Sequence, residues 1–265
     1  MENERFSEFS YGFVLTDELI NWHGTPLTTA PVFPSLQKEG QTGGGYDVKL
    51  PGIPLFLQFK LSHRMQKNSA KEIKTSCGLK TKFFRMYLRP RNRSKQHQLL
   101  LDLESGGNLV FYAAPAFFET SELDQAYLNR QVAKRSVFVR PSAIGPLNDD
   151  QKHHISFQNA AATLGYFFSD PVRPRSIELT RETHLREIVR TGLGTSGRGP
   201  LNNDMFAEIA KTMIIAIKER FNEHAVFPTV DVFAVTKVLN PIQQVAYFAQ
   251  VFFDSTLFIV QERKK

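Results

Sequence analysis

The chain has 265 residues, a single cysteine (Cys77) and a formal net charge of +7. One cysteine excludes an internal disulfide framework and a zinc site built from several cysteines of the same chain. The acidic, polar start and the lack of a long apolar run predict a soluble cytoplasmic protein with no membrane span. The excess positive charge favours a polyanionic partner such as nucleic acid.

The first half of the chain predicts alternating helices and strands. Residues 7 to 22 have the apolar spacing of a helix, and a loop rich in Gly, Pro and Thr follows them. Residues 43 to 65 predict a β-hairpin around the turn Pro-Gly-Ile-Pro, and residues 68 to 90 are expected to be helical in part. A helix over 94–107 should lead into a buried strand over 108–115, as in a unit that returns to the same sheet.

The second half continues this alternation less regularly. The expected elements are a helix over 121–135, a strand over 136–141, helices over 183–192, 204–223 and 240–254, a strand or mixed segment over 229–239, and a closing strand over 255–263. These elements predict an α/β fold with a mixed central sheet flanked by helices. A boundary near 145 would divide the chain into a core over 1–145 and a C-terminal α/β extension over 146–265; one continuous body is the alternative.

The predicted hairpin carries polar residues where a core strand is usually apolar. If Leu50 pairs with Leu55, then Asp47 lies opposite Gln58, and Gln58 shares a face with Lys60. The opposite face then holds Leu55, Leu57, Phe59 and Leu61. The alternative is an ordinary solvated face of an antiparallel strand.

The same residues resemble a nuclease motif. Gly45-Tyr46-Asp47 is followed by ten residues and then by Gln58-Phe59-Lys60. An acid near a strand end followed by an (Asp/Glu/Gln)-X-Lys triplet on the next strand resembles the PD-(D/E)XK, or restriction-endonuclease-like, superfamily. Gln in place of the second acid is similar to its modified-DNA restriction enzymes. The resemblance covers about residues 8–118 and implies a nuclease core within 1–145.

The resemblance also implies a metal site. Asp47, the Gln58 side chain and the Phe59 backbone carbonyl would bind Mg²⁺, with Mn²⁺ as a substitute, and Lys60 would orient the attacking water or stabilise developing charge. The superfamily usually supplies a further acid from an N-terminal helix. Glu18 is the natural match, with Glu8 behind it and Glu39 as a rival from the loop. The alternative for each is a solvated acid.

Positive charge is concentrated over residues 60–95, where Glu72 is the only acid. Arginines interleaved with aromatic residues can contact phosphates and stack on bases; the alternative is a solvated basic helix. The predicted nucleic-acid-binding residues are Arg64, Lys82, Arg85, Arg89, Arg91, Arg93 and Lys95. His97 either faces the cleft or lies on a helix surface. The sequence "GLGTSG", residues 192–197, is expected to be a flexible loop rather than a dinucleotide site.

Together these patterns predict a Mg²⁺-dependent endonuclease that hydrolyses DNA, with RNA left open as a substrate, in restriction or anti-phage defence. A regulatory partner subunit or a homo-oligomer would restrain such an activity. The alternative, from another functional class, is a catalytically inactive module with the nuclease fold that binds nucleic acid or a partner protein.

Overall fold

The computed structural model describes residues 6–21, 53–75, 77–169, 174–195, 203–221, 238–253 and 255–260. The elements in chain order are α1 (Glu8–Ile20), β1 (Ile53–Phe59), β2 (Ser62–Met65), α2 (Lys71–Lys74), β3 (Phe83–Leu88), α3 (Gln96–Ser105), β4 (Leu109–Pro115), α4 (Thr120–Leu128), β5 (Ser136–Val139), α5 (Pro141–Ile144), β6 (His153–Phe157), β7 (Leu164–Phe168), β8 (Arg175–Glu178), α6 (Glu182–Thr195), α7 (Asn203–Phe221), α9 (Pro241–Phe252) and β9 (Thr256–Val260). Among the described residues, no helix is long and apolar enough to cross a membrane.

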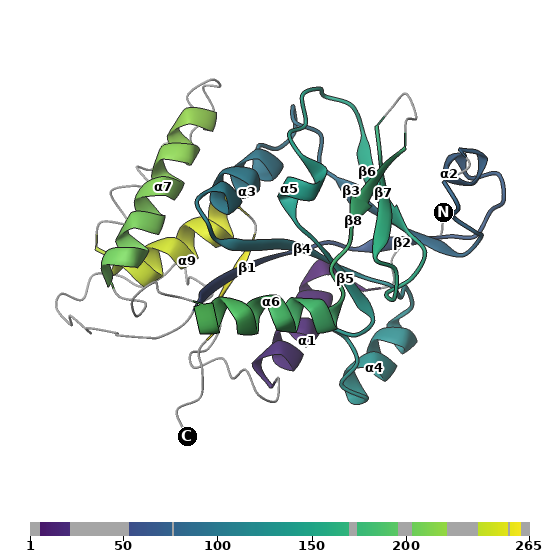
Figure 1. The fold of residues 1–265 in the computed structure, drawn as a ribbon, viewed down its shortest axis with the longest axis horizontal. Coiled ribbons are helices and arrows are strands. Elements are labelled where there is room, and N and C mark those ends of the chain that lie inside the picture. The colour runs from purple at the N-terminus through teal and green to yellow at the C-terminus, as the bar shows by residue number, and fades with distance from the viewer. Residues whose placement is uncertain are drawn as a thin grey trace.

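A four-stranded mixed sheet forms the centre of the fold, with strand order β5-β4-β1-β9. β1 pairs in parallel with β4 and antiparallel with β9, and β5 runs antiparallel to β4. In Figure 1, α1, α4 and α6 lie on one side of this sheet, and α3, α7 and α9 lie on the other. The predicted α/β fold with helices flanking a mixed sheet is therefore confirmed.

The side chains of β1 alternate between two buried layers. Leu55 and Leu57 pack with residues of α1, α4 and α6 in one core cluster. Phe56 packs on the other face, with residues of α3, α7 and α9. Gln58 and Lys60 follow Phe56 at the period of two that strand geometry imposes. The predicted alternation is present, but neither face of β1 is solvated.

The first strand of the predicted hairpin, residues 43–50, lies outside the described residues, but the Leu50–Leu55 pairing of that hairpin is wrong. Leu55 is bonded in the sheet to both of its neighbours, Leu109 of β4 and Phe258 of β9. A strand has only two hydrogen-bonding edges, so Leu55 cannot also pair with Leu50. The antiparallel partner of β1 is β9, at the far end of the chain. The turn sequence Pro-Gly-Ile-Pro carries no information about so distant a strand.

A second, five-stranded antiparallel sheet has the order β2-β3-β6-β7-β8. The expectation of helix over 68–90 holds only for the four residues of α2, because residues 83–88 form β3. Phe84, Met86 and Leu88 face the main core, whereas Arg85 and Tyr87 face away from it. This alternation with a period of two is typical of a strand. The basic composition of the segment is compatible with a helix and did not distinguish the two structures.

Both sheets combine strands from the two halves of the chain. β9 completes the four-stranded sheet, and β6, β7 and β8 extend the five-stranded sheet from β3. Residue 145 therefore does not separate one sheet from the other. The domain boundary near 145 and the continuous body both stay predictions. The C-terminal helices were predicted closely, except that α6 runs on to Thr195 through part of the expected Gly-rich loop. The strand or mixed segment expected over 229–239 lies almost wholly outside the described residues.

Candidate functional site

The carboxyl end of β1 brings together two of the predicted site residues. Gln58 is fully buried and Lys60 is 4% exposed. Parallel pairing sets Gln58 beside Tyr112 of β4, and the Lys60 backbone N–H donates to the Ala113 carbonyl at 2.9 Å. Lysine is seldom buried so deeply unless another group binds it, so the strand places an unusual charge inside the protein.

Helix α3 covers these side chains with its first turn. The Lys60 Nζ donates to Gln96 Oε1 at 3.3 Å. Gln96 and its neighbour His97 are both buried, with exposed fractions of 5% and 6%. The N-terminus of α3 therefore lies at the carboxyl end of β1, and the helix then leads into β4, the strand parallel to β1. This edge is where open α/β sheets commonly bind ligands.

His97 is neither exposed on a helix surface nor directed into an open cleft. Its Nε2 lies 2.8 Å from the Gly145 carbonyl, which can only accept, so Nε2 carries the proton. Its Nδ1 then accepts from the Tyr112 hydroxyl at 2.8 Å. Burial lowers the pKa of His97 despite the bond to Gly145. A neutral histidine thus links α3 to β4 and to the turn after α5.

Glu18, the predicted second acid, has a different role. Its carboxylate accepts the backbone N–H groups of Val132 and Ala133 at 2.6 and 3.2 Å. Burial raises the pKa of Glu18, and these two bonds oppose the rise. Val132 and Ala133 belong to the core on the α1 side of the sheet, whereas Lys60 contacts α3 on the other side. The structure does not bring Glu18 to Gln58 and Lys60.

The remaining predicted metal ligands are only partly described. Asp47 and Glu39 lie outside the described residues, and Glu8 lies at the start of α1, beside a surface pocket lined by Phe9, Phe13 and Phe59. Within the described part of the chain, no group of three or more His, Cys, Asp or Glu side chains could hold a metal ion. Gln58 and the Phe59 carbonyl offer neutral oxygens, which a hard cation accepts. Asp47 as the carboxylate ligand of such a site stays a prediction.

The seven predicted nucleic-acid-binding residues fall into different environments. Arg64 forms ion pairs with Glu119 and Glu122 and lies over the Phe118 ring. Arg85 is bound to buried Glu72. The exposed members of the set are Lys82, Arg89, Arg91 and Arg93, and Lys95 is half-buried at the N-cap of α3.

The five-stranded sheet carries a buried polar cluster that the sequence did not predict. Glu72 of α2 is fully buried. Its Oε1 accepts from Arg85 Nε at 2.6 Å, from His154 Nε2 at 3.0 Å and from Ser156 Oγ at 3.3 Å. Burial would raise the pKa of Glu72, but the His154 bond and the Arg85 charge lower it to about 2. Arg85 also donates to the Tyr87 hydroxyl at 2.8 Å.

The sequence thus failed to indicate two groups of buried polar residues. The contacts of Gln96 and Tyr112 arise only when α3 packs on the sheet, so no local sequence pattern indicated them. Glu72 stood out only as the single acid in the basic stretch 60–95. No family model matches this chain, and no curated protein or solved structure matches it either.

Proposed function

We propose that this chain is a Mg²⁺-dependent endonuclease that hydrolyses DNA phosphodiester bonds in the cytoplasm, in restriction or anti-phage defence. The observation that carries the proposal is the buried Lys60, which shares a face of central strand β1 with Gln58 and is held by Gln96 of α3. A further support is that α3 leads directly into β4, the strand parallel to β1, because the nuclease resemblance implies a helix followed by a core strand here.

The chemistry suits these residue types. A hard cation bound by Asp47, Gln58 and the Phe59 carbonyl would neutralise charge on the scissile phosphate and position a water molecule. Lys60 would orient that water or stabilise the negative charge of the transition state, and burial strengthens such an electrostatic contact. The bond to Gln96 would fix the ammonium in place. Because Gln58 carries no charge, the cation would depend strongly on Asp47.

Plasmid cleavage tests this assignment. Supercoiled plasmid is incubated with the full chain and Mg²⁺ or Mn²⁺, beside Asp47→Asn and Lys60→Met. Methionine fills a volume close to that of lysine without the charge, so the core around α3 should stay packed. Lys152→Met, at an exposed site, is the matched control. We expect wild type and control to nick or linearise the plasmid and both site variants to lose this activity.

The results separate the nuclease from its alternative. Cutting that survives both site substitutions would overturn the assignment of the site. Binding of plasmid by all variants, with cutting by none, would instead favour the catalytically inactive module. Gln58 is neutral at a position where the nuclease resemblance implies an acid, and this difference is what supports the catalytically inactive module. RNA substrates in parallel reactions show whether the activity is restricted to DNA.

A further inference from the structure

The segment between β2 and β3 carries a surface whose exposed charges are all positive. We propose that this segment, residues 66–75 and 77–82 and here named the lysine platform, is the main contact for the phosphate backbone of nucleic acid. The inference rests on the proposed function for the identity of the ligand. It departs from the arginine-centred interface expected from the sequence.

Lysines dominate the exposed side chains of the platform. Lys67, Lys74, Lys80 and Lys82 are exposed, as is Lys71 in α2. None of the first four forms an ion pair with a described residue. The only acid of the segment is Glu72, which is fully buried and bound to Arg85. Its negative charge therefore does not face the surrounding solvent as the lysine charges do.

Three contacts hold the platform in place. The Lys82 N–H donates to the Met65 carbonyl at 3.0 Å and closes the base of the segment. The Gln158 side chain of the loop after β6 accepts from the Lys80 N–H at 2.8 Å. Glu72 joins α2 to β3 and β6 through Arg85 and His154. A surface fixed before binding loses less conformational entropy when a ligand arrives.

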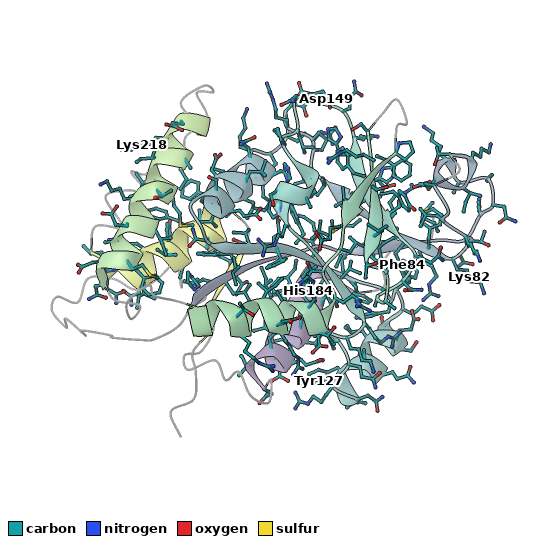
Figure 2. The ribbon with its side chains drawn as sticks, viewed as in Figure 1. Lys82, Phe84, Tyr127, Asp149, His184 and Lys218 are labelled. Atoms are coloured by element: carbon teal, nitrogen blue, oxygen red, sulfur yellow. The ribbon has the colours of Figure 1, made fainter. Side chains whose placement is uncertain are left out.

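Three arginines of the basic stretch 60–95 lie beside acidic side chains. Arg91 lies 3.9 Å from Asp150, and both side chains are more than half exposed. Arg64 and Arg85 are occupied by Glu122 and Glu72. Lys67, Lys74, Lys80 and Lys82 therefore differ from Arg64, Arg85 and Arg91, each of which lies within 4.0 Å of a carboxylate. Figure 2 shows Lys82 at one end of the molecule and Lys218 at the other, so the two regions can be tested separately.

The chemistry of the platform favours a phosphate backbone over a lipid surface. Ala70 and Leu79 of the platform are buried with Phe83 of β3 in a small cluster, so these apolar side chains are not available for insertion into a bilayer. Spaced lysines act as mobile point charges that neutralise successive phosphates and release their counterions. This interaction is largely independent of base sequence, as an endonuclease needs for scanning DNA.

The test compares two variants in which the same number of positive charges is removed. The platform variant carries Lys67→Gln, Lys74→Gln, Lys80→Gln and Lys82→Gln. The control carries Lys134→Gln, Lys152→Gln, Lys211→Gln and Lys218→Gln, all at exposed sites elsewhere. Binding of the full chain to a fluorescent 30-base-pair duplex is measured by anisotropy over a range of NaCl concentrations without divalent cation. Circular dichroism confirms that both variants remain folded.

We expect the platform variant to bind roughly tenfold or more weakly at low salt, and the slope of log K against log[salt] to fall by about 0.9 for each phosphate that the protein no longer neutralises. The control should keep the wild-type slope. Equal weakening of binding in the two variants, or no binding by wild type, would overturn the inference. Equal competition by poly-glutamate of matched charge would assign the surface to an acidic protein instead.

Failure of the inference and failure of the nuclease proposal give different results. Lysine-dependent binding without plasmid cutting would keep the platform and remove the nuclease. Plasmid cutting that is unchanged in the platform variant, with unchanged salt dependence, would keep the nuclease and remove the platform.

Discussion

Replacing Glu72 by glutamine should strongly destabilise the protein, because this buried carboxylate holds α2 on the five-stranded sheet. Its pKa is lowered from 4.5 to about 2. Each unit of pKa difference between the folded and unfolded states corresponds to ~1.4 kcal/mol, so the ionised carboxylate contributes about 3 kcal/mol at neutral pH. Glu72→Gln also leaves the Arg85 guanidinium, 13% exposed, without its anionic partner, and breaking a buried pair costs about 3–5 kcal/mol.

Urea unfolding at pH 7 measures this effect. Glu208→Gln is the matched control, because Glu208 pairs with Lys211 at 3.9 Å and both side chains are well exposed. We expect the free energy of unfolding to fall by about 3 kcal/mol for Glu72→Gln and by less than about 1 kcal/mol for the control. A decrease for Glu72→Gln no larger than that of the control would refute the reasoning.

The pH dependence gives a second check on the same carboxylate. Because the folded-state pKa of Glu72 lies below its unfolded value, the unfolded chain binds more protons between pH 4.5 and about 2. The stabilisation is therefore complete above pH 4.5 and is lost as the pH falls toward 2. The difference in unfolding free energy between wild type and Glu72→Gln should shrink over this window. A difference that stayed constant with pH would show that the stabilisation does not come from the carboxylate charge.

Three further predictions concern the neighbourhood of the candidate site. Gly12→Ala should lower the free energy of unfolding by about 1–3 kcal/mol, because the added Cβ would lie 2.7 Å from the ring of Phe59. Phe59 stands between Gln58 and Lys60 in the sequence, so a shift of its ring should also reduce plasmid cutting; unchanged unfolding and cutting would contradict the close packing of α1 on β1. Glu18→Ala should lower the free energy of unfolding by about 1–3 kcal/mol, since two buried N–H groups lose their acceptor; cutting that vanishes in a variant with wild-type stability would instead support a metal-binding Glu18. His97→Gln should make the free energy of unfolding less sensitive to acid than in wild type, because the lowered pKa of His97 means that its stabilising contribution is complete above pH 6.5 and is lost progressively as the pH falls below that value. Urea unfolding of both proteins at pH 8 and pH 5 measures this difference, and identical pH dependence in the two proteins would contradict it.

The fold class and the positions of most elements could be predicted from residue spacing alone. Apolar periodicity located α1, α3, α7 and α9 within a few residues, and the alternation through Phe56, Gln58 and Lys60 correctly gave these residues one face of β1. Local spacing carries this information because helix and strand periods follow from backbone geometry alone. The concentration of basic residues over 60–95 was equally visible.

The contact partners of these residues could not be predicted, because they depend on how distant parts of the chain pack together. The pairing of β1 with β9 joins residues about 200 positions apart, and no local turn signal encodes such a contact. The same holds for Glu18, which binds the backbone at Val132 and Ala133, and for Glu72, which neutralises Arg85. A charge in the sequence becomes surface charge or a buried contact only when the chain folds. The exposed lysines between β2 and β3 and the buried Lys60 under α3 therefore differ in environment, not in residue type.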